Sequence, residues 1–374
     1  MSDNNEKLES DCKLIAPYFD SKRYIRMYGE SEPSVSLDPI AHYIKEGGLK
    51  GYEPSAFFDG AFYLEQYKDI YQNNLNPLLH YIRHGFDEGR RSKGDDFYLN
   101  RVSDLDLENK SLNFKKWRIP CIITDETIAA HPSVQEVISL VHDTKAVATI
   151  LDRGSDDWLI VFAGKNESFY HLNKMKPFWG NVLFMRDTSS TYYCENPALP
   201  KIDLISKYID YLTGPRVGKT ILIGQSFGGH SALYQSAYIK DAVTFGFSVQ
   251  SHNKDLYPHN VYFASTIKKL NPIACAPDVV THLRKAADAP RYVLVGKSES
   301  SHEEDYYWGD AIAAGLLAGT GKCSVVIVDR KEHPTIQYLD AVKFFELIRE
   351  NYNLFETDSR AAAMLLCQNR IYYC

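Results

Sequence analysis

The chain has 374 residues, 44% hydrophobic and 24% charged, a composition typical of a folded protein with one or two domains. Its formal net charge of −6 argues against nucleic acid as the main partner. No apolar run approaches the roughly 18 residues that span a bilayer, and the polar start, Met1 to Lys7, does not resemble a secretory signal. Seven scattered cysteines without a Cys-x-x-Cys pair predict reduced thiols. We therefore expect a cytoplasmic protein that has no transmembrane segment and needs no metal or other cofactor.

The first hundred residues contain a repeat with an offset of about 38 residues. The matching positions are Phe19-Asp20 and Phe58-Asp59, Asp38-Pro39 and Asn76-Pro77, His42-Tyr43 and His80-Tyr81, and Gly47 with Gly51 and Gly85 with Gly89. Each unit is expected to form a helix, a loop, a helix that begins at proline, and a glycine-rich exit. The aromatic residues are expected to stack one repeat on the next, with a surface that stacks sugar rings as the alternative. The paired histidines favour structural hydrogen bonds over metal binding.

The repeat resembles a short helical module found beside bacterial glycosyltransferases and other surface-polysaccharide proteins. The likeness covers about residues 18–93 and is carried by Phe-Asp-x3-Tyr-x3-Tyr followed by Asp/Asn-Pro-x2-His-Tyr. It implies no reaction. It does direct the substrate prediction toward glycans, and it implies partners among polysaccharide-biosynthesis proteins.

A polar stretch of mixed charge follows the repeats and predicts a linker. The resulting prediction is a helical domain of two repeats over 1–94, a linker over 95–117, an α/β domain over 118–354 and a C-terminal helical extension over 355–374.

The α/β domain is predicted from short β-rich runs that alternate with helical patterns. Strands are expected near 119–124, 146–151, 158–163, 181–186, 219–224, 243–249, 291–296 and 323–328. Helices are expected near 133–141, 200–212, 228–239, 277–286, 302–318 and 335–350. This alternation predicts a mostly parallel sheet with helices on both faces. In such sheets the functional site lies at the carboxyl ends of the strands.

The most informative motif is Gly224-Gln225-Ser226-Phe227-Gly228, which stands between a predicted strand and a predicted helix. A serine on a strained strand-to-helix turn, with small residues two positions before and after it, is the pattern of a nucleophile elbow. The helix N-terminus there would favour negative charge. We predict that Ser226 is a catalytic nucleophile.

A serine nucleophile needs a base and an acid, which follow it along the chain in this type of fold. His333, on the loop after the last predicted strand, is the predicted base, and His230 is a weaker alternative. Glu299 is the preferred acid because it comes three residues after the strand-ending Gly296. Asp305 is the second choice for the acid, and Asp255 is a distant third.

The oxyanion hole is predicted to consist of the Phe227 N–H and the Lys165 N–H, with Gly164 allowing close approach of the backbone. Gln225, Asp187 and Tyr192 are predicted to contact the substrate, because they lie beside the serine or on a polar, aromatic loop after the strand near 181–186.

Residues 118–352 together resemble the α/β-hydrolase superfamily through the Gly-x-Ser-x-Gly turn, the Val295-Gly296-x2-Glu299 turn and Glu332-His333-Pro334. The resemblance implies a serine hydrolase that forms an acyl-enzyme, here an esterase acting on acylated small molecules or on acyl groups of a bacterial glycan. A glycan O-acyltransferase is the alternative. A non-catalytic glycan-binding or scaffolding protein is the alternative from another class. The sequence departs from the family in lacking a His-Gly-Gly-Gly loop and in having glutamate at the favoured acid position.

Overall fold

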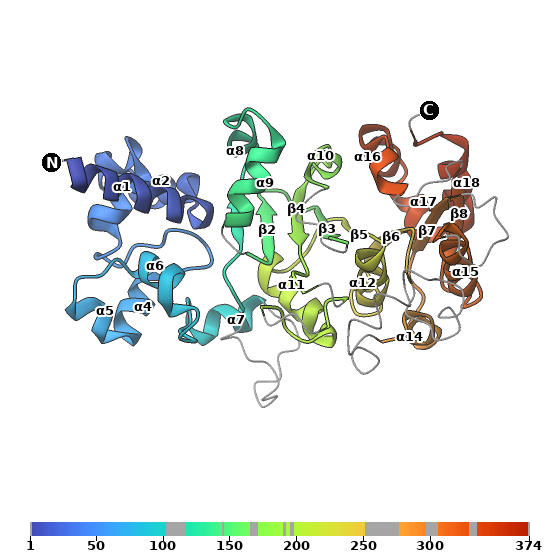
Figure 1. Ribbon diagram of the computed structural model, residues 1–374, viewed down its shortest axis with the longest axis horizontal. Coiled ribbons are helices and arrows are strands. Elements are labelled where there is room, and N and C mark those ends of the chain that lie inside the picture. The colour runs from blue at the N-terminus through green and yellow to red at the C-terminus, as the bar shows by residue number, and fades with distance from the viewer. Residues whose placement is uncertain are drawn as a thin grey trace. The chain divides into compact units, whose positions relative to one another are not determined.

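The computed structural model describes residues 2–101, 117–143, 146–164, 171–189, 192–194, 198–250, 277–296, 306–328 and 335–372 (Figure 1). The chain divides into two compact units. The first comprises Met1–Leu151 with Lys207–Pro215, and the second comprises Asp152–Ser206 with Arg216–Cys374. These units follow packing, so the domain boundaries drawn from the sequence remain predictions. Among the described helices, none combines the length and the apolar character needed to cross a bilayer.

The repeats in the first unit are built from short helices. The elements are α1 (Ser2–Ile15), η1 (Ala16–Tyr18), α2 (Ser21–Tyr28), η2 (Pro33–Ser36), α3 (Pro39–His42), η3 (Tyr43–Gly47), α4 (Gly60–Gln66), α5 (Lys68–Gln72), α6 (Pro77–His80) and η4 (Tyr81–Gly85). The helices α3 and α6 begin with proline, as predicted. The η3 and η4 turns continue them with π-type hydrogen bonding.

The repeated acidic and amide residues are helix N-caps. Each cap side chain accepts a hydrogen bond of 2.9–3.1 Å from the backbone N–H three residues later. The caps are Asp20, Asp38, Asp59 and Asn76. The Phe-Asp and Asp/Asn-Pro pairs of the repeat therefore mark the positions where helices begin.

The repeated tyrosine and histidine form a hydrogen bond in each repeat, which is buried in the first repeat and partly buried in the second. The Tyr24 hydroxyl group lies 3.0 Å from His42 Nδ1, and the Tyr63 hydroxyl group lies 2.9 Å from His80 Nδ1. This confirms the prediction that the histidines are structural. The glycines that follow leave room for these hydroxyl groups, because a Cβ on Gly85 would collide with the Tyr63 hydroxyl oxygen.

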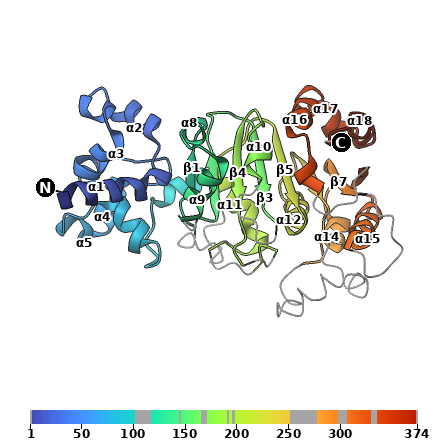
Figure 2. The same cartoon turned by 45° about the horizontal axis from the view of Figure 1, so that its top comes forward.

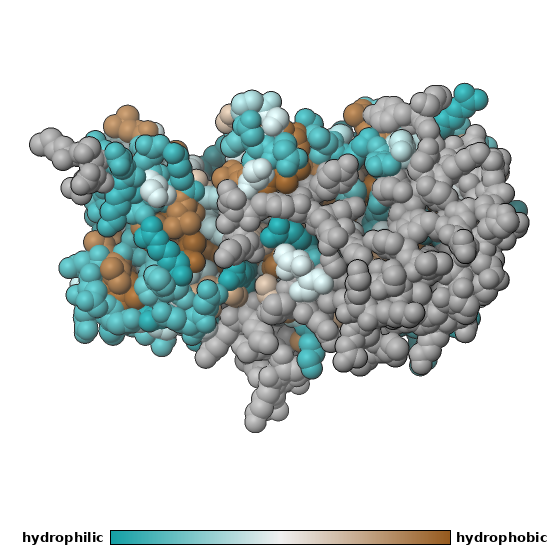
Figure 3. All heavy atoms as spheres, in the orientation of Figure 1, coloured by the Kyte–Doolittle hydropathy of each residue, from teal (hydrophilic) through white to brown (hydrophobic). Residues whose placement is uncertain are grey.

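Among the described residues, the aromatic ring contacts of the repeats gather around one tyrosine in each repeat, and the expected stacking of one repeat on the next remains a prediction. One cluster surrounds Tyr24 and the other surrounds Tyr63, and both of these rings are fully buried. Hydrophilic residues predominate on the repeat surface seen in Figure 3, with hydrophobic residues between them. Among the described tyrosine, phenylalanine and tryptophan residues of the repeats, Tyr71, 59% exposed, is the one with an exposed ring. The described repeats thus lack the row of exposed rings that would stack sugars.

Each repeat closes on its own beginning. The Asp20 N–H donates to the Pro54 carbonyl, and the Asp59 N–H donates to the Ser92 carbonyl, both at 2.9 Å. In each repeat the C-terminal end is therefore hydrogen-bonded to the residue that caps its first helix.

The predicted linker begins with a helix, α7 (Asp95–Arg101). The Arg101 guanidinium group lies 5.0 Å from the Phe57 ring centre and 4.9 Å from the Phe97 ring centre. Its Nη1 donates to the carbonyl groups of Tyr211 and Leu212 at 2.9 and 3.2 Å. These contacts fix α7 inside the first unit, so this part of the predicted linker is an ordered element of the fold.

The chain forms one eight-stranded sheet in the order β1-β2-β4-β3-β5-β6-β7-β8. The strands are β1 (Cys121–Ile123), β2 (Ala148–Leu151), β3 (Trp158–Phe162), β4 (Asn181–Met185), β5 (Thr220–Gln225), β6 (Ala242–Phe247), β7 (Arg291–Gly296) and β8 (Ser324–Val328). Each described strand pairing is parallel. All eight predicted strands are therefore confirmed, within one or two residues at each end. Continuous β-branched and aromatic runs, buried along β2 to β7, explain the agreement.

Helices cover both faces of the sheet, as predicted. The remaining elements are α8 (Asp125–Ala129), α9 (Val134–Asp143), α10 (Leu172–Met175), η6 (Ile202–Leu204), α11 (Ile205–Thr213), α12 (Phe227–Gln235), α14 (Val279–Lys285), α15 (Tyr306–Ala318), η8 (Thr335–Tyr338), α16 (Ala341–Glu350), α17 (Tyr352–Thr357) and α18 (Ser359–Gln368). Within the second unit, Figures 1 and 2 show α16, α17 and α18 on one side of strands β5 to β8, and α12, α14 and α15 on the other. The helices α17 and α18 lie near the C-terminus, where an extension over 355–374 remains a prediction.

Candidate functional site

Ser226 stands on a strained turn between β5 and α12. Its backbone angles are φ 54° and ψ −116°, a conformation that costs a non-glycine residue on the order of 1–3 kcal/mol. The Ser226 N–H donates to the Phe247 carbonyl at 2.9 Å, and the Ser226 carbonyl accepts from the His230 N–H at 3.1 Å. These bonds join the turn to the end of β6 and to the first turn of α12. The predicted elbow geometry is present.

The glycines that flank the serine are required by close backbone contacts. A Cβ on Gly224 would collide with the Gly228 carbonyl, and a Cβ on Gly228 would collide with the Phe162 carbonyl. The same Gly228 Cβ would also lie 2.8 Å from the Ala163 carbonyl oxygen. The first turn of α12 therefore rests directly on the end of β3.

This contact places two predicted parts of the oxyanion hole side by side. Phe227 is the first residue of α12, and Gly164 follows Ala163 at the end of β3. Phe227 is buried. As the first residue of α12, its N–H has no acceptor within the helix, because the first N–H groups of a helix are not used by the helix's own hydrogen bonds. Lys165, the predicted second donor, lies outside the described residues.

The predicted base and acid also lie outside the described residues, namely His333, Glu299 and Asp305. The strands that precede them, β7 and β8, are described. They pair in parallel with each other, and β7 pairs with β6, next to the serine strand β5. Because the carboxyl ends of parallel strands lie at one edge of a sheet, β7 and β8 both end at the edge that carries Ser226. The roles of the three residues remain predictions.

His230, the alternative base, is occupied elsewhere. Its side chain is fully buried, and its Nε2 lies 2.9 Å from the Pro277 carbonyl oxygen. Its ring makes an edge-on contact with Tyr192, with 5.0 Å between the ring centres. These contacts give His230 a structural role between α12 and the segment that precedes α14.

Asp187 and Tyr192 hold the loop after β4 in shape. The Asp187 carboxylate accepts hydrogen bonds from the backbone N–H groups of Ser189, at 3.0 Å, and Tyr193, at 2.9 Å. The Tyr192 side chain is 1% exposed and stacks on Phe227, with 3.9 Å between the ring centres and an interplanar angle of 21°. The structure therefore gives both residues a positioning role, and their contact with substrate remains a prediction.

Gln225, the last residue of β5, is the third predicted substrate contact. Its side chain is 2% exposed, and its Oε1 has no hydrogen-bond partner among the described residues. A buried acceptor beside the nucleophile is available to a ligand donor, although no described contact tests this role.

Two residues of this edge were missed by the sequence analysis, Tyr193 and Arg186. Tyr193 is fully buried, and its hydroxyl group donates to the carbonyls of Ala163 and Met185. Arg186 is buried directly after β4, and the loss of hydration lowers the pKa of its guanidinium group. Nothing in the local sequence marks Tyr193, because its hydroxyl contact with Ala163 joins segments that are distant along the chain.

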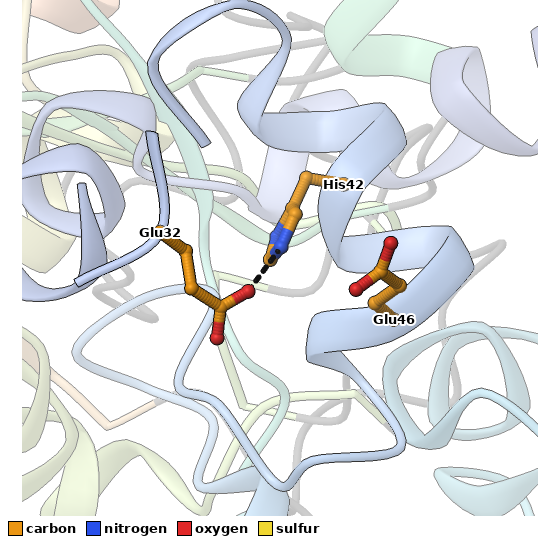
Figure 4. Close-up of side chains that lie close together, drawn as sticks. All are labelled: Glu32, His42 and Glu46. Atoms are coloured by element: carbon orange, nitrogen blue, oxygen red, sulfur yellow. Dashed lines mark hydrogen bonds and ion pairs between the residues drawn. The ribbon is translucent and has the colours of Figure 1, made fainter. Parts of the chain in front are cut away.

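A cluster in the first repeat has the composition of a metal site, but a lysine ammonium group binds both of its carboxylates. Glu32, His42 and Glu46 bring possible ligand atoms within 4.8 Å of one another (Figure 4). His42 Nε2 lies 2.8 Å from Glu32, and Lys50 Nζ donates to Glu32 at 2.8 Å and to Glu46 at 3.2 Å. Hydrogen bonds from Lys50, Tyr52 and His42, in that order of importance, lower the pKa of Glu32 to about 2. The Lys50 ammonium group thus compensates the carboxylates, and we assign no metal to this cluster.

No protein-family model matches the sequence, and no curated protein matches it. Solved structures are similar to part of the chain at low identity. An esterase from Pyrococcus furiosus is 15% identical, with a TM-score of 0.37 over 55% of this chain and 83% of its own. The capsule O-acetyltransferase of Neisseria meningitidis serogroup A is 15% identical, with a TM-score of 0.39 over 55% and 92% of the two chains. Esterase B from Lactobacillus rhamnosis is 9% identical, with a TM-score of 0.43 over 57% and 81%. At these values the likenesses assign no activity to this chain.

Proposed function

We propose that this chain is a serine enzyme that transfers acyl groups through an acyl-enzyme, acting as an esterase with Ser226 as the nucleophile. The carrying observation is the Ser226 backbone, strained at φ 54° between a buried strand and a helix N-terminus. Strain of this kind persists only where the surroundings impose it, and it clusters at active sites. The close contacts of Gly224 and Gly228 impose it here.

The chemistry follows from the residues at this edge. Ser226 Oγ attacks the carbonyl carbon of the ester, and His333 accepts the serine proton. The Phe227 N–H, with Lys165 as the second donor, stabilises the negative charge that develops on the carbonyl oxygen. The bond from carbon to the leaving oxygen then breaks, and His333 returns the proton to that oxygen. Water completes the cycle by attacking the acyl-enzyme, which releases the carboxylic acid and restores the serine.

The substrate class that we propose is an acyl group carried on a bacterial glycan. Support comes from the resemblance of the repeats to modules beside polysaccharide enzymes, which also suggests polysaccharide-biosynthesis proteins as partners. A glycan O-acyltransferase would use the same acyl-enzyme and differ only in that a sugar hydroxyl replaces water.

A fluorophosphonate probe tests the nucleophile. The wild-type protein should be labelled, whereas Ser226→Ala and His333→Ala should not be. Ser139→Ala, which removes a serine that donates to the Gln135 carbonyl in α9, should be labelled like the wild type. An unlabelled wild-type protein with a cooperative unfolding transition would exclude the enzyme proposal and favour a non-catalytic glycan-binding or scaffolding protein.

A second experiment identifies the triad acid. Glu299→Gln should lower kcat for a simple acyl ester by on the order of 10³–10⁴-fold, as loss of a triad carboxylate does elsewhere. Asp305→Asn is the matched variant. If the large loss occurs in Asp305→Asn and not in Glu299→Gln, the acid is Asp305.

A further inference from the structure

The residues Tyr192 and Tyr193 share an uncommon backbone conformation. Their φ values are 58° and 64°, so two consecutive non-glycine residues occupy the left-handed region. Each such residue costs about 1–2 kcal/mol relative to ordinary backbone. Both side chains are almost completely buried. Surrounding contacts must therefore hold the pair in this conformation.

The contacts of Tyr193 reach the end of β3. Its hydroxyl group donates to the Ala163 carbonyl at 3.1 Å and to the Met185 carbonyl at 2.9 Å. Its ring also meets Phe162 edge-on, with 5.4 Å between the ring centres. Tyr193 thus joins the carboxyl ends of β3 and β4 immediately before Gly164, where the loop of the predicted oxyanion hole begins.

The contacts of Tyr192 are with the beginning of α12, the helix that follows Ser226. Its ring stacks on Phe227, the residue after the proposed nucleophile. Its carbonyl accepts a hydrogen bond of 3.4 Å from Ser231 Oγ in α12. The Asp187 carboxylate accepts the Tyr193 N–H at 2.9 Å and so fixes the junction between the two tyrosines.

We propose that Tyr192 and Tyr193 are positioning residues that align the two backbone segments of the oxyanion hole. This inference rests on the proposed function. Tyr192 holds Phe227, and Tyr193 holds the carbonyl of Ala163, which precedes Gly164, from adjacent positions on one strained dipeptide. An oxyanion hole works by having its donors in place before charge develops, and it does so only when supporting residues lock the geometry. The strain in the dipeptide is then part of the cost of that alignment.

The test compares single hydroxyl deletions with the fluorophosphonate probe. Tyr193→Phe removes the hydroxyl group and keeps the ring. Tyr292→Phe is the matched control, because the buried Tyr292 hydroxyl group donates to the Phe355 carbonyl at 2.8 Å near the opposite, amino end of β7. Tyr192→Leu removes the ring that stacks on Phe227.

We expect the limiting labelling rate to fall about 10- to 100-fold in Tyr193→Phe and Tyr192→Leu, with the half-saturating probe concentration unchanged. Tyr292→Phe should label like the wild type. Thermal unfolding of the three variants shows whether Tyr193→Phe and Tyr292→Phe destabilise the fold to a similar degree. Equal labelling rates in Tyr193→Phe and Tyr292→Phe would overturn the positioning role and leave the proposed function intact. A folded wild-type protein that is not labelled would overturn both.

Discussion

Gly228, in the first turn of α12, lies against the carbonyl group of Phe162 at the end of β3, with no room for a side chain between them. A Cβ at residue 228 would lie 2.7 Å from the Phe162 carbonyl carbon and closer still to its oxygen. This contact joins the helix that follows Ser226 to the strand that leads into the predicted oxyanion loop.

Gly228→Ala should therefore lower the free energy of unfolding by about 1–3 kcal/mol, because the methyl group forces the helix and strand apart. It should also abolish labelling by the fluorophosphonate probe. Gly315→Ala is the control, since the exposed Gly315 in α15 has open space around its Cβ position. That variant should be neutral or more stable by up to about 1 kcal/mol. Unfolding in urea, with both variants beside the wild type, measures the difference. Equal stability of the two variants would contradict the packing argument.

The repeats make a prediction about helix caps. Asp59→Ala removes the acceptor for the Phe62 N–H at the start of α4 and should lower the free energy of unfolding by about 1 kcal/mol. Asp59→Asn keeps a capping oxygen and should recover most of the loss. Chemical denaturation measures both. If alanine and asparagine are equivalent at this position, the cap contributes nothing to stability.

The pH dependence of stability should carry a contribution from His80. Burial, as the largest cause, lowers the pKa of His80 below its ordinary value of 6.5. The unfolded chain then binds a proton at a higher pH than the folded chain, so this contribution to stability is present above about pH 6.5 and is lost as the pH falls below it. His80→Gln cannot take up that proton. Its free energy of unfolding should therefore fall less than that of the wild type between pH 7.5 and pH 5.5, and parallel curves would contradict the assignment.

The helix α7 gives a prediction about the predicted linker. Arg101→Met keeps most of the side-chain stem but removes the donors to the Tyr211 and Leu212 carbonyls and the cation between two rings. It should lower the free energy of unfolding by about 2 kcal/mol. Arg360→Met, at an exposed position in α18, should change it by less than about 0.5 kcal/mol. Urea denaturation compares the two, and a stable Arg101→Met would show that α7 is not held by these contacts.

The strands could be predicted because each is a short, continuous apolar run, and the elbow could be predicted because strand, turn and helix are consecutive in the chain. The order of the strands could not, since the placement of β4 between β2 and β3 depends on packing between distant segments. The short helices α8 and α10, of five and four residues, were missed because such short segments cannot display the spacing of apolar residues that identifies a helix.

The loop after β4 shows where local reasoning reached its limit. A mixture of polar and aromatic residues there predicted contact with substrate at Asp187 and Tyr192. The structure shows the carboxylate bound to backbone N–H groups and the ring stacked on Phe227. Phe227 lies far from the loop along the chain, so no pattern within the loop could have identified its contact with Tyr192.

The hydrogen bonds that tie Pro54 to Asp20 and Ser92 to Asp59 have a consequence for how such a domain changes in length. In each repeat the last residues are hydrogen-bonded to the first helix cap, so the chain begins the next repeat from an equivalent position. A copy can therefore be gained or lost as a cassette while its neighbours keep their caps, their Tyr-His hydrogen bonds and their buried rings. Duplication of this segment would therefore need no new connection between repeats, and proteins with different numbers of copies could keep the same repeat structure.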